Sequence, residues 1–477
     1  MNYSDFLKMV PEASLVSILI ILFVADFISA KAQERKWFNP LVCVLMFAQT
    51  LVCLLPQVAT SAFGGMYVTS NSVEAMKAIL SFGTLIVLIQ SKTWAIKSGK
   101  EGEFYMLIVS TLIGMYVMMS AGHFLMFFLG LEMASVPLAT TVAFDKYRND
   151  SAEAAAKFIL TATFSSGVML YGISLLYAAT GTLYYDDVVS KITPSALSIM
   201  GLVFFFSGLG FKISLVPFHF WTADTYQGAP TSVTGYLSVV SKGAAAFTLC
   251  TILMKVFASL VTYWTCLLFI VIVLSITIAN LFAIRQSELK RFMAFSSISQ
   301  AGYIVLAIVG NTSMSVTALS FYVLVYVVAN MAVFTIINVV EQANDGKTMI
   351  EDYNGFYTTN PKLAFLMTLA LFSLGGVPPF AGMFSKFFVF MAAVKGADVQ
   401  TTMGGWAYGV VFIALLNTVI SLYYYLKIVK AMYISHSDTP LPTFKSDVNT
   451  KFALALCTLG VILMGVCSFV YDWLATV

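Results

Sequence analysis

The stretch SLGGVPPFAGMFSK, residues 373–386, decides how this chain folds. It lies inside an apolar run at about 362–395, and a membrane span needs only about 20 apolar residues. Two glycines followed by Pro378 and Pro379 cannot stay in a regular helix, because proline removes a backbone donor and clashes with the preceding turn. Unwound backbone at membrane depth is tolerated only where protein or water covers it. The stretch therefore predicts a broken transmembrane helix with Lys386 beside the break.

A second stretch, SGLGFKISLVP at residues 207–217, has the same ingredients. Two glycines, Lys212 and Pro217 follow one another inside the apolar run 195–217. Spans interrupted by Gly and Pro at corresponding places of two halves are typical of transporters built from inverted repeats. The two interrupted spans are five spans apart, and units of five spans face opposite ways in a membrane. We therefore predict two inverted repeats, formed by spans 4–8 and 9–13.

The composition supports a membrane protein with many spans. Of 477 residues, 59% are hydrophobic and 10% are charged, whereas soluble chains have roughly 25% charged residues. So few charges cannot cover a water-exposed surface, and the same values exclude disorder, collagen and nucleic-acid binding. The apolar runs are long and continuous, which excludes a transmembrane β-barrel. The fold class we expect is an all-α polytopic membrane protein.

Fourteen apolar runs are candidate spans. Their approximate limits are 12–30, 40–60, 72–91, 103–120, 122–143, 154–179, 195–217, 230–256, 258–284, 291–310, 314–341, 362–395, 406–434 and 451–475. This count divides the chain into four parts. They are the N-terminal flank (1–100, spans 1–3), the first repeat (101–257), the second repeat (258–434) and the C-terminal span 14 (435–477).

Positive charges give the orientation. If the N-terminus is outside, eighteen Lys and Arg lie in cytoplasmic loops, five lie outside, and three lie in spans, which accounts for all 26. Cytoplasmic loops of membrane proteins carry the excess of positive charge. We therefore predict that both termini are outside, which is the periplasm in a bacterium. The chain has no nucleotide-binding loop, so it is not an ATP-driven pump by itself.

Four charged residues stand out because they lie deep inside spans: Glu132, Lys212, Lys242 and Lys386. Each costs about 2.5–3.5 kcal/mol at a helix centre, so together they cost on the order of 10–14 kcal/mol. One alternative is snorkelling to the headgroups. For Lys242 it would require a reach of roughly 15 Å, or ten residues at 1.5 Å each. A structural ion pair between helices is the other alternative.

These residue types suit proton transfer. Burial and a neighbouring cation make a lysine release its proton more easily, whereas a nearby carboxylate makes it keep the proton. We therefore expect Lys212 and Lys242 to influence one another, with Glu132 as the switching partner in a proton relay. His219, Ser214 and Ser241 would support it. Ser238 and the run 296–300 could extend it, although such groups also serve as helix–helix hydrogen bonds.

No cofactor site is predicted. The six cysteines lie in apolar stretches and include no C-x-x-C pair, and no histidine has metal-ligand spacing. We interpret the cysteines as packed thiols. Zinc, haem and iron–sulfur ligation are therefore not expected in this chain.

Five motifs together resemble one family. They are Leu131-Glu132-Met133 through Pro137, Lys212 with SLVPFHFW (214–221), YQGAPT (226–231), LKRFMAFSSI (289–298), and GVPPF (376–380) leading to Lys386. They resemble the antiporter-like membrane subunits of respiratory complex I, the bacterial proton-pumping NADH:quinone oxidoreductase. The resemblance runs from about span 4 to span 13. Three details favour one of the sister subunits over the others. The chain is short, it ends after span 14 without the long lateral helix of the largest sister, and it has Lys386 where another sister has a glutamate.

The resemblance implies a function for the chain as part of a complex. Glu132, Lys212, Lys242 and Lys386 would carry protons, driven by quinone reduction elsewhere in the complex. FMN, iron–sulfur clusters and quinone would be held by partner subunits, and none by this chain. The partners would be other membrane and peripheral subunits, including neighbouring antiporter-like subunits, in the inner membrane of a bacterium.

Two other functions remain open from the sequence. The chain could be a subunit of a multisubunit sodium/proton antiporter that has no redox partner. It could also be a membrane scaffold whose buried charges only fix helix packing.

Overall fold

The structure is a computed structural model that describes residues 3–29, 35–55, 59–344, 346, 348–437 and 439–477. The described chain is almost entirely helical, which confirms the expected fold class. It divides into two compact units. The first contains the residues up to Ile213 and Val240–Thr265, and the second contains Ser214–Val239 and Cys266–Thr476.

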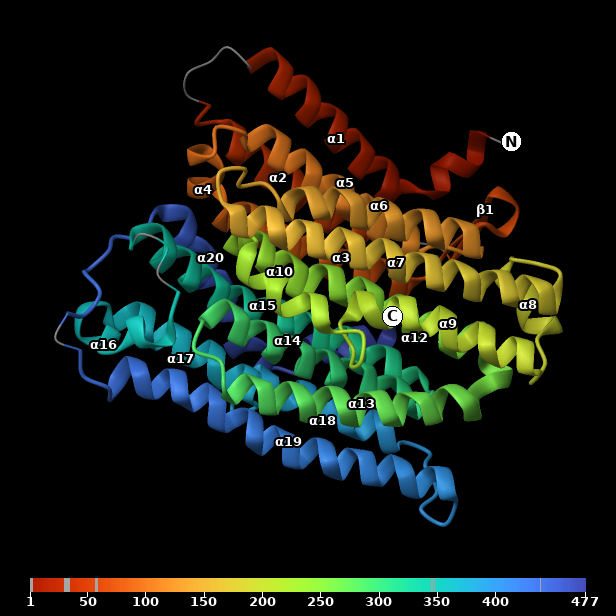
Figure 1. Cartoon of the computed structure of the whole chain (residues 1–477). Coiled ribbons are helices and arrows are strands. Elements are labelled where there is room, and N and C mark those ends of the chain that lie inside the picture. Colours follow the sequence, from red (N-terminus) through yellow and green to blue (C-terminus); the bar gives the residue numbers. More distant parts are fainter. Residues whose placement is uncertain (1–2, 30–34, 56–58, 345, 347, 438) are drawn as a thin grey trace. The chain divides into compact units, whose positions relative to one another are not determined.

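In the first unit, long helices run lengthwise beside one another (Figure 1). Its elements are α1 (Val10–Ser29), α2 (Phe38–Leu54), β1 (Thr60–Ala62), β2 (Tyr67–Thr69), α3 (Asn71–Gln90), α4 (Lys92–Lys97), α5 (Glu101–Met119), α6 (Phe124–Val142), α7 (Asn149–Thr180), α8 (Tyr185–Lys191), α9 (Ala196–Ile213) and α12 (Lys242–Lys255). The closest neighbours are α5 with α6, α7 with α9, and α2 with α3.

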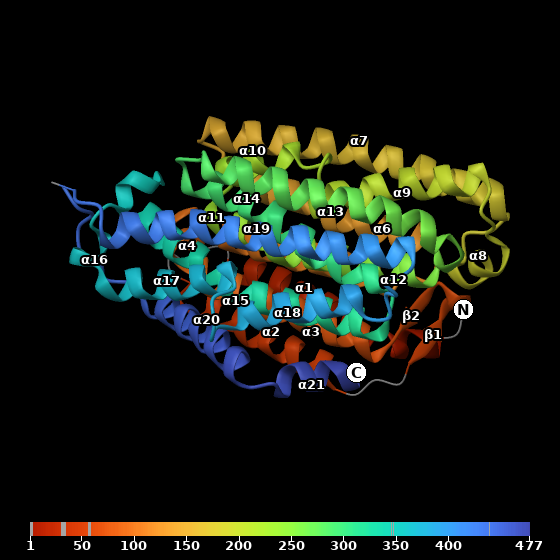
Figure 2. The same ribbon diagram turned by 90° about the horizontal axis from the view of Figure 1, so that it is seen from below.

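The second unit contains the longest helix of the C-terminal half, α19, and both parts of a broken helix (Figure 2). Its elements are α10 (Phe220–Gly228), α11 (Thr231–Tyr236), most of α13 (Val261–Ile284), α14 (Leu289–Leu306), α15 (Ser313–Ala343), α16 (Phe356–Thr359), α17 (Pro361–Gly375), α18 (Ala381–Val394), α19 (Thr402–Tyr433), α20 (Val448–Val466) and α21 (Phe469–Thr476). Helix α15 packs against α17, α18 and α20.

Among the described residues, twelve helices are long and apolar enough to cross a membrane. Three shorter apolar helices, α2, α17 and α18, correspond to the expected span 2 and to the two parts of span 12. The fourteen crossings and the inverted repeats stay predictions. Span 14 differs from its expected limits, because α20 ends at Val466 and a separate short helix, α21, begins at Phe469.

Glycines bring α5 and α6 close together. A side-chain carbon added at Gly114 would lie 2.4 Å from the Ala134 backbone nitrogen, and one added at Gly130 would lie 2.5 Å from the Met118 nitrogen. Small residues of this kind let helix backbones approach closely in membranes. This approach fixes the position of the face of α6 that carries Glu132.

Three details differ from the sequence analysis or lie outside it. An antiparallel hairpin pairs β1 with β2, Ser61 opposite Val68, and was not predicted. The interpretation of all cysteines as packed thiols is wrong for Cys266, which is exposed in the described chain. Lys31 and Lys347, which were counted among the cytoplasmic charges, lie outside the described residues.

Candidate functional site

Lys212 lies at the C-terminal end of α9, in the first unit. The helix ends one residue later, and Ser214 then takes a left-handed conformation with φ 68°, which is uncommon for a residue other than glycine. The break therefore lies at Ser214, after the two glycines that the sequence analysis associated with it. Lys212 Nζ donates a hydrogen bond of 2.8 Å to Ser135 Oγ of α6 and lies 6.0 Å from the Phe158 ring centre.

Glu132 is half-buried and lies on α6, three residues before Ser135. Residues three apart on a helix are neighbours on its surface. Glu132 and Lys212 make no ion pair within 4.0 Å. The buried Oε1 of Glu132 has no hydrogen-bond partner among the described residues. Glu132, Ser135 and Lys212 thus form one group between α6 and α9, with a carboxylate oxygen still open to a partner.

Lys242 begins α12, directly after the π-helical turn Leu237–Ser241. Such turns are rare and often mark functional sites. Lys242 and Ser241 are both buried. Helix α12 packs against α9 and α5 in the first unit. The structure therefore places Lys242 on a helix that contacts the one carrying Lys212.

In the second unit, Lys386 is the sixth residue of α18, which follows the break that separates α18 from α17. Its Nζ donates a hydrogen bond of 3.2 Å to the Gly375 carbonyl at the end of α17 and lies 5.0 Å from the Tyr303 ring centre. Gly376 caps α17 with φ 84°. The predicted break at Gly376–Pro379 is confirmed, and it exposes to Lys386 a carbonyl that a continuous helix would use internally.

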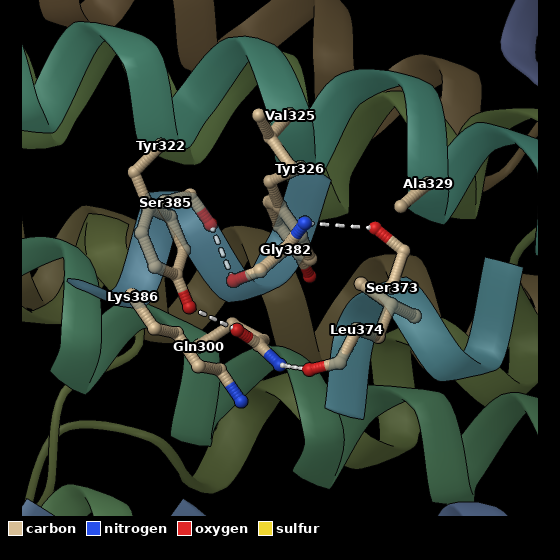
Figure 3. Close-up of a pocket in the computed structure, with 10 residues that line it drawn as sticks. All are labelled: Gln300, Tyr322, Val325, Tyr326, Ala329, Ser373, Leu374, Gly382, Ser385 and Lys386. Carbon is tan, nitrogen blue, oxygen red and sulfur yellow. Dashed lines mark hydrogen bonds between the residues drawn. The ribbon is translucent and has the colours of Figure 1, made fainter. Parts of the chain in front are cut away.

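A small cavity of about 10 Å³ lies beside Lys386 (Figure 3). It is lined by Gln300, Tyr322, Val325, Tyr326, Ala329, Ser373, Leu374, Gly382, Ser385 and Lys386. A cavity of roughly this size holds one water molecule, provided that it offers two or more polar partners. The side chains of Lys386, Gln300 and Tyr322 supply them.

Gln300 connects the hydroxyl groups around this cavity. Its Nε2 donates to the Leu374 carbonyl at 3.2 Å, and its Oε1 accepts from Tyr322 (Figure 3). The same Nε2 also donates to Tyr425 Oη at 3.2 Å. Tyr425 is in turn 2.6 Å from Ser296 Oγ. Buried networks in which most members are satisfied hold side chains in one arrangement. The polar groups next to Lys386 are therefore fixed in position.

The supporting residues Ser214, His219 and Ser241 are buried. Ser214 Oγ has no hydrogen-bond partner among the described residues. The His219 ring lies 4.6 Å from that of Phe220. Ser214 and His219 both belong to the second unit. The structure thus brings Lys212 together with Ser135 and Glu132, and brings Lys386 together with Gln300.

The burial of the three lysines bears on the alternatives. The exposed fractions of Lys212, Lys242 and Lys386 are 5%, 1% and 4%. A snorkelling side chain keeps its charged end in the aqueous or headgroup region, so these low values disfavour snorkelling. The alternative of a structural ion pair requires a carboxylate partner for each lysine. Lys212 and Lys386 make no ion pair with a described residue.

Sequence reasoning missed several partners. Ser135 could have been found from its spacing of three residues from Glu132, but Tyr322 and Tyr425 carry no such signal. Lys290 was counted as a loop cation, yet the structure buries it. Its Nζ lies 3.3 Å from Glu341 Oε1 and donates to the Ala229 carbonyl at 3.1 Å. This ion pair joins α14 to α15 within the second unit.

Comparison with known proteins places the chain in a family. Residues 121–413 match the family model described as "NADH:quinone oxidoreductase/Mrp antiporter, TM". The NADH-quinone oxidoreductase subunit N of Phocaeicola vulgatus is 54% identical over all of this chain and 99% of the relative. That of Azobacteroides pseudotrichonymphae is 47% identical over all of this chain and 98% of the relative.

Solved structures are similar as well. A chain of respiratory complex I from Thermus thermophilus matches with a TM-score of 0.79 and 28% identity, over 95% of this chain and 96% of that chain. A chain of the Mrp complex from Dietzia matches with a TM-score of 0.83 over 98% and 96%, but at 18% identity, so it shares the fold. The chain therefore belongs to the NADH:quinone oxidoreductase/Mrp antiporter transmembrane family and, within it, to the NADH-quinone oxidoreductase subunit N family.

Proposed function

We propose that the chain is a proton-translocating membrane subunit of a respiratory NADH:quinone oxidoreductase. It is part of an enzyme by membership of the complex, and quinone reduction in other subunits drives its proton movement. The single observation that carries this proposal is the group of Glu132, Ser135 and Lys212, in a chain 54% identical to a subunit N over its full length. A buried ammonium without a paired carboxylate is an expensive arrangement that a scaffold does not need.

Glu132, Lys212, Lys242 and Lys386 are the proposed proton carriers. A lysine ammonium releases one proton and becomes a neutral amine, and a carboxylate takes up one proton and becomes neutral. Lys212 donates to Ser135 Oγ, and that hydroxyl donates to the Leu131 carbonyl at 2.6 Å. Glu132 has a buried oxygen open to a partner in the same region. Lys212 and Glu132 make no direct ion pair, so proton movement between them would require side-chain movement or water.

Lys386 would serve the second repeat in the same way. Its ammonium lies beside a cavity with room for about one water, between Gln300 and Tyr322. His219, Ser214 and Ser241 would support the relay from the ends of the interrupted helices. We further propose the division into flank 1–100, repeats 101–257 and 258–434, and final span 435–477, with both termini in the periplasm.

The complex supplies what this chain does not. We propose that FMN, iron–sulfur clusters and quinone are bound by partner subunits, and that neighbouring antiporter-like subunits contact this chain in the bacterial inner membrane. A sodium/proton antiporter without a redox partner is the other candidate. Its support is the likeness to the Mrp complex, which at 18% identity extends to the fold alone.

The test uses the intact complex carrying Glu132→Gln or Lys212→Ala. Donor:quinone activity and the pH gradient are measured together in proteoliposomes, with and without sodium. Lys157→Ala is the matched control, because Lys157 is an exposed lysine of α7 that pairs with Glu153. We expect intact complexes in which both activities collapse in the two test variants and stay normal in the control.

Two results would contradict the proposal. Normal quinone reduction and a normal pH gradient in both test variants would show that these residues are structural. A pH gradient that forms without quinone reduction and depends on sodium would favour the antiporter instead.

A further inference from the structure

A second group of buried charges lies outside the residues that match the family model, near the start of α1 and α3 in the first unit. Lys77 of α3 lies between two carboxylates. Its Nζ is 2.7 Å from Glu12 Oε1 of α1 and 2.7 Å from Glu74 Oε1 of its own helix. The exposed fractions of Lys77, Glu12 and Glu74 are 0%, 4% and 3%. We call these three residues the Glu12–Lys77–Glu74 cluster.

The cluster has one negative charge too many. Two carboxylates and one ammonium leave a net charge of −1 if all three are ionised. Among the described residues, the neighbouring titratable groups are the phenols of Tyr67 and Tyr116, whose rings lie 5.6 and 5.5 Å from Lys77 Nζ, and the thiol of Cys53 on α2. Phenols and thiols are neutral in their ordinary state at neutral pH. None of these groups supplies the missing positive charge.

Helix α12 also packs against α3. Of its titratable groups, Lys255 pairs with Asp186 at 2.9 Å, and the Cys250 thiol contacts the Met254 sulfur at 3.4 Å. Lys242 begins the helix and therefore lies at the opposite end from Lys255. An uncompensated charge in a low-dielectric interior is costly, and such groups commonly take up a proton instead.

Hydrogen bonds show which carboxylate stays ionised. Glu12 Oε1 accepts from the Lys77 ammonium and from Ser120 Oγ at 3.3 Å. Glu12 Oε2 accepts from Tyr67 Oη at 3.0 Å. Both oxygens therefore receive donors, and donors to a carboxylate favour its charged form.

Glu74 is different. Its Oε1 accepts from Thr69 Oγ1 at 2.5 Å and from Lys77 Nζ. Its Oε2 is buried and has no hydrogen-bond partner among the described residues. An ionised oxygen that is buried without a donor bears the full desolvation cost. Adding a proton to this oxygen removes the charge and leaves the bonds of Oε1 in place.

We propose that the Glu12–Lys77–Glu74 cluster is a proton-binding site, in which Glu74 holds one exchangeable proton on Oε2 and Glu12 remains the ionised partner of Lys77. Binding converts the Glu74 carboxylate and one proton into a neutral carboxyl group, and release reverses this. The site is separate from Glu132, Lys212, Lys242 and Lys386. It lies beside the β1–β2 hairpin, since Tyr67 and Thr69 of β2 donate to its two carboxylates.

Infrared spectroscopy of the whole purified complex tests this proposal, because a protonated carboxyl group has a C=O stretch that shifts in D₂O. We expect this band in the wild type, its loss on raising the pH, and its absence in Glu74→Gln. Glu103→Gln is the matched control, since Glu103 is an exposed glutamate at the start of α5. The control spectrum should equal that of the wild type.

A second variant decides the matter if Glu74→Gln does not assemble. In Glu12→Gln, Glu74 becomes the sole counter-ion of Lys77, so we expect it to ionise and the same band to disappear. A Glu74→Gln spectrum identical to the wild type would overturn the proposal, as would a Glu12→Gln complex that keeps the band. A wild type without the band, or with bound sodium detected in its place, would also overturn it.

Discussion

The ammonium of Lys212 and the hydroxyl of Ser135 are joined by a hydrogen bond of 2.8 Å that links α9 to α6. The same hydroxyl donates its proton to the Leu131 carbonyl at 2.6 Å, so it faces Lys212 as an acceptor. Glu132 lies three residues earlier on α6. The lysine is therefore held against α6 by a neutral group, and it makes no ion pair with Glu132.

Removing the Ser135 hydroxyl should weaken the proposed relay without unfolding the chain. A hydrogen bond to a charged group contributes about 1.5–3 kcal/mol, and 1.4 kcal/mol corresponds to about tenfold. We expect Ser135→Ala to lower coupled quinone reduction by roughly tenfold in an assembled complex. The control is Ser110→Ala, whose hydroxyl bonds to its own helix at Met106. Equal activity in the two variants would show that Ser135 does not position Lys212.

Arginine at position 212 should abolish coupled activity, even though the positive charge is kept. The guanidinium stays protonated at all accessible pH values and cannot release a proton. We expect Lys212→Arg and Lys212→Ala to assemble and to lose most of the pH gradient and quinone reduction. If Lys212→Arg retained normal activity, a fixed charge would suffice and titration of Lys212 would be excluded.

Gln300 should be needed for the second repeat. Replacing it with leucine leaves the Tyr322 and Tyr425 hydroxyls and the Leu374 carbonyl without this partner, at about 1–3 kcal/mol for each buried group. We expect Gln300→Leu to lower the thermal midpoint of the complex and its proton pumping. Gln286→Leu is the control, because that amide bonds to its own helix at Phe282. An unchanged midpoint in Gln300→Leu would contradict the network.

Gly382 should not tolerate a side chain. An added side-chain carbon would lie 1.7 Å from the Ser373 carbonyl oxygen, and the Gly382 amide donates to Ser373 Oγ at 3.1 Å. We expect Gly382→Ala to separate α17 from α18 and to reduce the amount of assembled complex strongly. Gly409→Ala, with no atom within 4 Å, should assemble normally. Similar yields of both variants in membranes would refute this close packing.

The buried pair of Lys290 and Glu341 should be strongly coupled. Removing one partner of a buried ion pair costs about 3–5 kcal/mol, because the other charge is left uncompensated. We therefore expect the double variant to destabilise the complex by less than the sum of the effects of Lys290→Met and Glu341→Gln. The exposed pair of Lys157 and Glu153 provides the comparison, with a value of about 0–1 kcal/mol. Additive effects of Lys290→Met and Glu341→Gln would show that the two charges act independently.

Much of the fold could be predicted from apolar runs. The long helices, the break at Gly376–Pro379 and the burial of Lys212, Lys242 and Lys386 are all local consequences of composition and of proline chemistry. The predicted position of the break near Lys212 was less accurate. A helix within a packed membrane interior tolerates glycine. Helix α9 therefore continues through both glycines and ends at Ile213.

The site could be predicted in part. The charged residues were identified because a charge within an apolar run is visible in the sequence, whereas hydroxyl and amide partners are common in membrane helices and carry no such contrast. Tyr322, Tyr425 and Ser135 were therefore missed. The positions of Tyr322 and Tyr425 along the chain do not reveal that both bond to Gln300.

The sequence by itself determined that this chain is a membrane protein of many helices, that two of its helices are interrupted, and that Lys212, Lys242 and Lys386 lie deep within apolar runs. The reason is that hydrophobic length and backbone donors act locally. Only the tertiary structure decided that Lys212 meets Ser135, that Gln300 joins two tyrosines beside Lys386, and that Lys77 lies between Glu12 and Glu74. These contacts depend on how each helix is rotated against its neighbours, and that rotation is set by the packing of side chains far apart in the sequence.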